Sequence, residues 1–368
     1  MMTFFKKVSA RVATELTFHS LVWEVLRRNS GIMGSTFALS RKIWNTFCYK
    51  LLPYCFMPPR LSTDSSNRTR LCDGTLAKSE FCKAFLKDDI HEEYQALIRN
   101  LDPESVATVV TLINRLRQVF LMGDPRFILT LEEKNTLQKL LTEFFPRIIR
   151  ISPSVWAYGH YTLPIWWFEP HVFFYRYHIS CLRTLDKVKN KAVIDAGAFI
   201  GDTAILFSEY TDKNVYAFEP FKQNYDLLKK TIALNPQCKN IIAVPYALGD
   251  ETTTLMGKFI GAAATLTSGV GRDGIHVVTL DDFVAEHHLD VGLIKVDVEG
   301  FEQRLIKGAE KTIKMQKPAL LLSIYHSPDD FFHIKPLIES WNLGYTFKII
   351  KPLDGQLFNE TMLVAEVL

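Results

Sequence analysis

Apolar and polar segments alternate through the second half of the chain. The runs Ala192–Ile194, Asn214–Phe218 and Ile241–Val244 have the length and composition of buried strands. Between them, residues 203–210 and 223–235 place apolar side chains three and four positions apart, which is typical of helices. Strands separated by helices predict a doubly wound, mainly parallel sheet of the α/β class.

The same alternation continues to residue 367. The further elements are a helix at Phe301–Lys307, a strand at Ala319–Ile324, a helix at Asp329–Trp341 and strands at Tyr345–Ile350 and Met362–Val367. In such sheets ligands bind beyond the carboxyl ends of the strands. The charged residues predicted to fall at these ends are Asp195, Glu219, Asp250, Asp297, Glu299 and His326. We therefore expect an active site along this edge.

The first half of the chain has a different pattern. Three segments, Asp89–Asn100, Pro103–Met122 and Leu131–Phe145, have helical spacing, and acids in their first turns are typical of helix starts. They predict a helical domain over residues 81–150. Residues 58–80 are rich in Ser, Thr, Asp, Asn and Pro and predict a linker or loop.

An aromatic-rich connector, residues 151–190, joins the helical domain to the α/β domain, residues 191–368. Ten of its aromatic residues are Trp156, Tyr158, Tyr161, Trp166, Trp167, Phe168, Phe173, Phe174, Tyr175 and Tyr177. Such side chains suit packing between domains and equally suit a wall against a sugar or another flat ligand. Both interpretations stay open.

Composition excludes several classes of protein. The chain has 368 residues, 48% hydrophobic and 23% charged, with a net charge of +3 that gives no indication of nucleic-acid binding. Its six cysteines form no C-x-x-C pair and no spacing with histidine, so the sequence predicts reduced thiols and no metal site.

The N-terminal segment, residues 1–57, is predicted to be helical and basic. Residues 1–60 hold nine basic and two acidic side chains, a local charge of +7, mixed with aromatic residues. They could contact an anionic membrane surface or form the solvated face of a helical domain. There is no signal-peptide pattern over Met1–Leu16 and no uncharged apolar window of about 18 residues. We expect a cytoplasmic protein, with peripheral contact at the inner membrane surface as an open alternative.

The sequence D-A-G-A-F-I-G-D, residues 195–202, is the main candidate for a cofactor turn. It follows a predicted strand and precedes a helix that Asp202 or Thr203 is placed to cap. The next strand ends at Glu219, at the distance where nucleotide-binding units place the carboxylate for a ribose. Any strand–helix–strand unit can contain a glycine turn and a downstream acid, so this motif alone does not establish a cofactor site.

The spacing of the turn separates two cofactors. Residues 198–200 are Ala-Phe-Ile, where the dinucleotide fingerprint has its middle glycine, and this argues against NAD and FAD. S-adenosylmethionine has no phosphates. It needs a close backbone turn, a carboxylate for its ribose and an acid that tolerates its positive charge, and Asp195, the Gly197–Gly201 turn and Glu219 supply these.

Five motifs lie in order over residues 192–300: D-A-G-A-F-I-G-D, F-E-P, A-L-G-D, V-T-L-D-D and I-K-V-D-V-E-G. In this combination the sequence resembles the FkbM family of S-adenosylmethionine-dependent methyltransferases. The resemblance implies a class I methyltransferase fold and O-methylation of sugars or of hydroxyls on natural products. It covers the C-terminal half of the chain only.

The resemblance also implies residue roles. Asp195, Gly197 and Gly201 would line the methionine end, together with Ala198 and Asp202 of the same turn. Glu219 would hold the ribose hydroxyls. The adenine would face Asp250 and the loop that starts at Ala247.

The catalytic candidates are His326, Asp297 and Lys295. Histidine has a pKa suited to removing a proton near neutral pH, and Asp297 is the other candidate base. Lys295 shares strand parity with Asp297 and Glu299 and could keep a carboxylate ionised. A structural histidine and an internal ion pair at the strand end are the alternatives.

The predicted function is methylation of a hydroxyl on a sugar, a glycan or a related metabolite, with a small-molecule or glycan acceptor. Two other functions stay open: a nicotinamide-dependent sugar dehydrogenase, and a scaffold with a degenerate cofactor domain.

Overall fold

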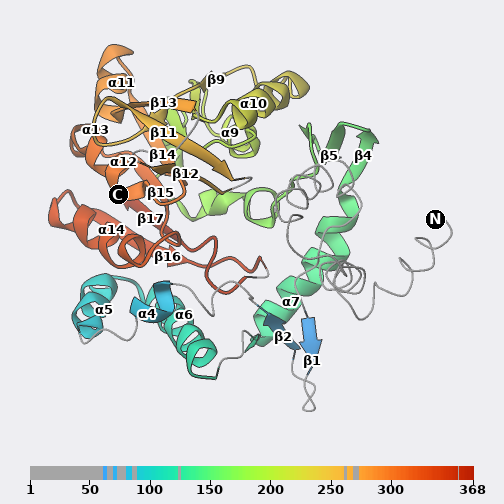
Figure 1. Ribbon diagram of the computed structural model, residues 1–368, viewed down its shortest axis with the longest axis vertical. Coiled ribbons are helices and arrows are strands. Elements are labelled where there is room, and N and C mark those ends of the chain that lie inside the picture. Colours follow the sequence, from blue (N-terminus) through green and yellow to red (C-terminus); the bar gives the residue numbers. More distant parts are fainter. Residues whose placement is uncertain are drawn as a thin grey trace, which may run out of the picture.

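The computed structural model describes residues 61–63, 69–72, 80–84, 89–122, 126–260, 263–267, 273–354 and 356–368. Its central feature is a seven-stranded sheet in the order β16-β17-β15-β14-β7-β8-β9. Six of these strands run in one direction, and β17 runs in the opposite direction between β15 and β16. The strands are β7 (Ala192–Ala196), β8 (Val215–Phe218), β9 (Ile241–Val244), β14 (Val291–Val296), β15 (Ala319–Ser323), β16 (Tyr345–Ile350) and β17 (Met362–Val367). The predicted α/β sheet is confirmed (Figure 1).

Helices cover both faces of this sheet because its central strands are apolar on both sides. Side chains alternate along β7, so that Val193 and Ile194 enter different hydrophobic cores. Helices α9 (Asp202–Phe207) and α10 (Lys222–Leu234) pack with Val193. Helices α11 (Leu280–Glu286), α12 (Glu302–Gly308), α13 (Glu310–Gln316) and α14 (Pro328–Ser340) lie on the face of Ile194.

A second sheet interrupts the alternation between β9 and β14. Its order is β10-β13-β11-β12, with mostly antiparallel pairing. The strands are β10 (Ala247–Leu248), β11 (Thr253–Ile260), β12 (Ala263–Thr267) and β13 (Asp273–Val278). The sequence analysis did not predict this sheet, because its strands pair mainly with one another rather than through strand–helix–strand units.

The predicted N-terminal helices are present. They are α5 (Ile90–Ile98), α6 (Pro103–Met122) and α7 (Leu131–Lys139), the last continuing through a π turn and a 3-10 turn to Arg147, and a short helix that was not predicted, α4 (Glu80–Ala84), precedes them. Helix α5 packs on α14, and α6 packs on β16 (Figure 1). Leu97, Val109 and Leu112 therefore enter the same core as Ile194. The region predicted as a separate helical domain is continuous with the α/β core.

The prediction of a loop over residues 58–80 needs correction. Strands β1 (Leu61–Thr63) and β2 (Thr69–Cys72) form an antiparallel pair, and β3 (Arg126–Ile128) pairs with β2. The third strand comes from beyond α6, so its backbone hydrogen bonds could not be anticipated from local composition.

The aromatic connector folds into its own small sheet. Strands β4 (Ile149–Ser152), β5 (Val155–Tyr158) and β6 (Tyr161–Leu163) are followed by helical turns at Pro170–Phe174 and Arg176–Cys181 and by the short helix α8 (Leu185–Val188). Several of its aromatic side chains are buried in the core that contains Val193: Trp156, Tyr161, Phe168, Phe173 and Tyr177. Packing between elements thus accounts for most of the aromatic content of this segment.

Two predictions concern residues outside this description. The basic segment, residues 1–57, and its membrane-surface contact fall on undescribed residues. Within the described part of the chain, none of the helices combines the length and apolar character that crossing a membrane requires. Of the six cysteines, Cys181 and Cys238 are free thiols, as predicted.

Candidate active site

A cavity of 560 Å³ opens where the parallel strands β7, β8, β14 and β15 end. It is lined by the turn after β7, the ends of β8 and β14, the segment after β15 and part of the aromatic connector. Among the predicted site residues it is lined by Gly197, Asp202, Glu219, Ala247, Lys295, Asp297 and His326. The predicted edge of the sheet is therefore the edge that carries the cavity.

The turn after β7 needs glycine at two positions. Gly197 has φ +75°, and a Cβ atom there would lie 1.8 Å from the carbonyl oxygen of Asp297. Gly201 has φ +87° and is itself the N-cap of α9, without a side-chain cap. The predicted capping by Asp202 or Thr203 is wrong, since the left-handed backbone at Gly201 places both residues inside the helix.

A buried ion pair supports this turn from below. Nζ of Lys295 lies 3.1 Å from Oδ1 of Asp195, and both side chains are almost fully buried. The ammonium group also donates hydrogen bonds to the carbonyl oxygens of Gly197 at 2.8 Å and Ala196 at 3.3 Å. The hydroxyl of Thr203 donates to Oδ2 of Asp195. Burial lowers the pKa of Lys295, but the charges of Asp195 and Asp297 raise it by more. The lysine is therefore a cation that holds the turn, and it is unsuited to act as a base.

Two buried acids face the cofactor end of the cavity. Glu219 follows β8 and accepts a hydrogen bond from the backbone N–H of Phe221. Burial raises the pKa of Glu219 to about 8, and it raises the pKa of Asp202 to about 7. Each carboxylate is therefore costly to ionise in the empty protein and gains from a ligand that donates hydrogen bonds or carries positive charge.

The prediction for Asp250 is not supported by its position. Ala247 lines the cavity, but Oδ1 of Asp250 accepts a hydrogen bond from Nε of Arg304 at 2.7 Å, outside the lining residues. The cause is close packing of the preceding backbone, since a Cβ atom on Gly308 would lie 1.8 Å from the carbonyl oxygen of Gly249. Asp195, Ala198 and Gly201 also lie behind the lining and support it.

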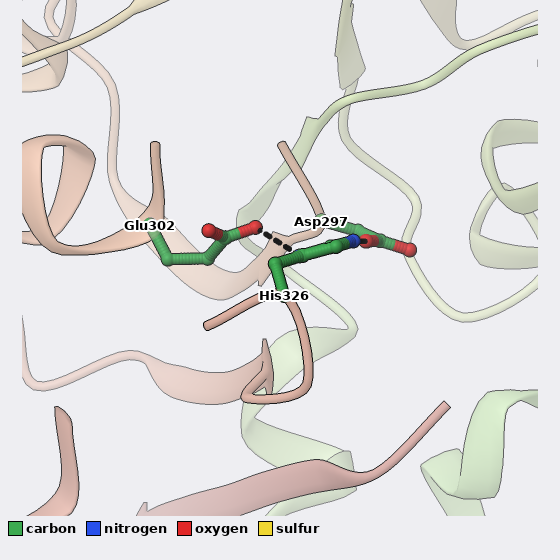
Figure 2. Close-up of side chains that lie close together, drawn as sticks. All are labelled: Asp297, Glu302 and His326. Atoms are coloured by element: carbon green, nitrogen blue, oxygen red, sulfur yellow. Dashed lines mark hydrogen bonds and ion pairs between the residues drawn. The ribbon is translucent and has the colours of Figure 1, made fainter. Parts of the chain in front are cut away.

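A further part of the cavity lining is rich in carboxylates. We call the residues Glu169, Asp297, Glu299, Tyr325, His326 and Glu360 the charged wall; all of them line the cavity. Figure 2 shows His326 between Glu302 and Asp297. Nδ1 of His326 donates to Oε1 of Glu302 at 2.8 Å, and Nε2 lies 3.5 Å from Oδ1 of Asp297 and 3.7 Å from Oε2 of Glu299.

The imidazole is strongly influenced by these carboxylates. Burial would lower the pKa of His326, but the hydrogen bond to Glu302 and the charges of Glu302, Asp297 and Glu299 raise it to about 10. Conversely, the hydrogen bond from His326 lowers the pKa of Glu302 against the effect of burial. Burial raises the pKa of Glu299 to about 7 and also raises that of Asp297. Without a ligand, both ring nitrogens of His326 are therefore protonated at neutral pH, and the side chain is a cation.

Sequence reasoning missed three members of this arrangement. Glu302 lies in the first turn of α12, where an acid is expected simply to favour the helix start. The hydroxyl of Tyr325 lies 3.3 Å from a carboxylate oxygen of Asp297 and 3.4 Å from one of Glu360, and it can donate to one of them at a time; Glu360 also contacts Nδ1 of His171 at 2.6 Å. The sequence pointed to His326 but not to the adjacent Tyr325, because a histidine at a strand end is a common catalytic residue.

Part of the aromatic connector forms one wall of the cavity. Trp167, Val172 and Tyr177 line it. The ring of Trp167 meets that of Phe199 edge to face at 5.4 Å, which joins the connector to the cofactor turn. The two interpretations of this segment thus apply to different residues.

The strand order, with one antiparallel strand inserted near the edge and a glycine turn after the central β7, defines a class I methyltransferase fold. Residues 195–347 match the model of the methyltransferase FkbM domain, so this part of the chain is similar to the FkbM methyltransferases. The sequence-based assignment is confirmed.

Two known proteins show the extent of the similarity. The methyltransferase sdnD of Sordaria araneosa is 24% identical over 168 residues, which cover 36% of this chain and 65% of that protein. The structure of the methyltransferase FkbM from Methylobacillus flagellatus KT superposes with a TM-score of 0.50 and 20% identity, covering 75% of this chain and 58% of the other. In both comparisons less than two thirds of the relative is covered.

The cofactor of this domain is S-adenosylmethionine, and the cavity suits it. Gly197 lines the cavity, and its backbone lies too close to the carbonyl group of Asp297 to leave room for a side chain. Glu219 and Asp202 are buried acids that line the cavity. The volume of the cavity is within the usual range for sites of small ligands, about 300–1,000 Å³.

Proposed function

We propose that the protein is a methyltransferase that transfers the methyl group of S-adenosylmethionine to a hydroxyl of a sugar, a glycan or a related metabolite. The observation that carries this proposal is that one cavity is lined by two chemically different groups of residues. The glycine turn with Glu219 supports cofactor binding, and the charged wall supports binding of a polar acceptor. The family of the domain supports the same class of reaction.

When bound, S-adenosylmethionine supplies an activated methyl group on a sulfonium. The chain's own residues must then hold the acceptor in line and exclude water. Trp167, Val172 and Tyr177 provide an apolar side to the cavity, which suits the flat face of a sugar ring. An aliphatic hydroxyl must also lose its proton as it reacts, so the acceptor oxygen needs to face the charged wall.

The residues of the charged wall divide this task. We assign Glu302 to positioning His326, because it is fully buried and its contact with Nδ1 fixes the ring. Asp297 accepts the proton of the acceptor hydroxyl, and His326 stabilises the negative charge that develops on the acceptor oxygen. Lys295 supports the cofactor turn through Asp195, and its charge also lowers the pKa of Asp297 against the effect of burial.

Calorimetric titration with S-adenosylhomocysteine tests the cofactor half of this proposal. We expect binding to the wild-type protein and none with NAD, which would separate the methyltransferase from the dehydrogenase alternative. Glu219→Gln should weaken binding by about 100-fold, because two hydroxyls lose their charged acceptor. Glu251→Gln, an exposed acid outside the cavity lining, is the matched control.

Methyl-labelled S-adenosylmethionine with a panel of sugars and other hydroxyl compounds tests the acceptor half. The proposal predicts label in an alkali-stable ether. Label on nitrogen or in an alkali-labile ester would contradict O-methylation. Tight binding of S-adenosylhomocysteine with no transfer to any member of a broad panel would favour the scaffold.

A further inference from the structure

His326 presents an unused donor atom to the cavity. Its side chain is 10% exposed, and Nε2 is buried with no hydrogen-bond partner among the described residues. The other ring nitrogen, Nδ1, faces the carboxylate of Glu302 at 2.8 Å. Because an ionised carboxylate only accepts, Nδ1 donates, and Nε2 is left to bind a proton or a cation.

Two carboxylate oxygens lie close to Nε2, at distances longer than those of ordinary hydrogen bonds. Oδ1 of Asp297 is 3.5 Å from Nε2, and Oε2 of Glu299 is 3.7 Å from it. Both distances are too long for a good hydrogen bond. Two ligands of one metal ion, each about 2.1 Å from it, lie between about 3 and 4 Å apart. The spacing thus suits donors that share a cation better than donors that bind each other.

The surroundings also resemble those of a metal ligand. Asp297, Glu302 and His326 each have a potential donor atom within 4.8 Å of the others (Figure 2). Oε2 of Glu302 is buried and has no hydrogen-bond partner in the described structure. A carboxylate behind a metal-binding imidazole is a common arrangement, because it fixes the tautomer and the orientation of the ring.

We propose that His326, Asp297 and Glu299 bind one divalent transition-metal ion on the cavity side, and that Glu302 is the positioning residue that orients His326. One imidazole and two carboxylates suit Mn²⁺, Fe²⁺ or Zn²⁺. Since all three ligands line the cavity, positions on the ion stay open for water or for an acceptor oxygen.

This site changes the proposed function at one point: with the ion bound, Nε2 of His326 is a ligand without a proton, and the ion in its place stabilises negative charge on the acceptor oxygen. A hydroxyl bound to a divalent ion loses its proton more readily than a free hydroxyl. The activation of the acceptor rests on the proposed methyl transfer, whereas the binding of the ion does not. The two can therefore be tested separately on the same protein.

Titration of the full chain with Mn²⁺, followed by the paramagnetic resonance of the free ion, tests the site. We expect one ion per chain, bound at least tenfold more weakly in Glu299→Gln and His326→Ala and about 10- to 100-fold more weakly in Glu302→Gln. His333→Ala is the matched control, because His333 also lies near two acids, Glu93 and Asp329, but on the surface of α14. It should leave binding unchanged.

Absence of Mn²⁺ binding, or equal binding in Glu299→Gln and wild type, overturns the proposal and leaves a protonated imidazole between carboxylates. Glu299 is 37% exposed, so its substitution keeps the test valid if the more buried variants fail to fold. Binding of S-adenosylhomocysteine is measured on the same samples. If the wild-type protein does not bind S-adenosylhomocysteine, the proposed function is refuted. If it binds S-adenosylhomocysteine but not Mn²⁺, only the metal site is refuted.

Discussion

Two parts of the cavity lining, the glycine turn with Glu219 (the cofactor end) and the charged wall, differ in how their charges are balanced. At the cofactor end, Lys295 and Asp195 neutralise each other beneath the glycine turn and are closed off from solvent. At the charged wall, His326 faces Glu302, Asp297 and Glu299, so that negative charge is in excess. The first arrangement is complete without a ligand, whereas the second is not.

This difference indicates how each end works. In the proposed function, the cofactor end recognises its ligand mainly through the shape of the backbone at Gly197 and through one acid, Glu219, both of which line the cavity. Its ion pair serves the fold. The charged wall keeps its groups in one place but leaves them electrically unbalanced, as a site does when the missing charge arrives with the ligand.

Removal of Lys295 should have the largest effect. Lys295→Met leaves Asp195 buried without its cation, and we expect a loss of about 3–5 kcal/mol in the free energy of unfolding, measured with urea. The double substitution Asp195→Leu with Lys295→Met should recover much of this loss. Lys191→Met breaks an exposed pair with Asp290 and should cost no more than about 1 kcal/mol. Similar losses for both lysine variants would contradict a structural role for Lys295.

Gly197→Ala should damage both stability and cofactor binding. The added Cβ atom would meet the carbonyl of Asp297, so the turn must move. We expect a loss of about 2–4 kcal/mol and no measurable binding of S-adenosylhomocysteine. Gly159→Ala is the control, because Gly159 also has a positive φ, +59°, but nothing lies within 4 Å of the new atom. If the two variants behave alike, the close approach at Gly197 is not what matters.

Affinity for S-adenosylhomocysteine should rise with pH. The pKa of Glu219 is about 8 in the empty cavity, and the ribose hydroxyls donate to its ionised form. Below about pH 8 the protein must therefore release a proton to bind, and we expect affinity to fall about tenfold per pH unit down to about pH 6. Asp202, with a pKa of about 7, acts with the same sign, and Asp202→Asn measures its share. Affinity that is independent of pH would exclude Glu219 as the ribose acid.

Asp250→Asn should have the smallest effect. Its carboxylate pairs with Arg304 outside the cavity, so S-adenosylhomocysteine affinity should change less than about twofold, and stability by less than about 1 kcal/mol. A tenfold loss of affinity would mean that Asp250 leaves Arg304 and enters the cofactor end, as the family resemblance implies.

The elements predicted most accurately are those whose pattern lies within one continuous segment of the chain. β9, β16, β17 and α6 have the predicted bounds, because each shows a clear apolar period. The small sheet β10–β13 and the β1–β2–β3 sheet were missed. The pairings of β2 with β3 and of β11 with β13 join strands distant in the sequence, which a local pattern does not reveal, whereas β1–β2 and β11–β12 are local hairpins.

The site divides in the same way. Gly197 and Glu219 could be predicted, because they belong to one continuous strand–turn–helix–strand unit. Glu302 could not, because its role depends on contact with a histidine 24 residues later. Lys295 was correctly placed as a charged residue at the strand end, but its direction toward Asp195 depends on the packing of β14 against β7.

The most direct test is to compare S-adenosylhomocysteine binding in wild type, Glu219→Gln and Glu302→Gln by calorimetry. Two distinct ends predict a loss of about 100-fold in Glu219→Gln and a change within about threefold in Glu302→Gln, which lies behind the charged wall. Equal losses in the two variants would contradict the account, because the cavity would then act as a single charged site without separate cofactor and acceptor ends.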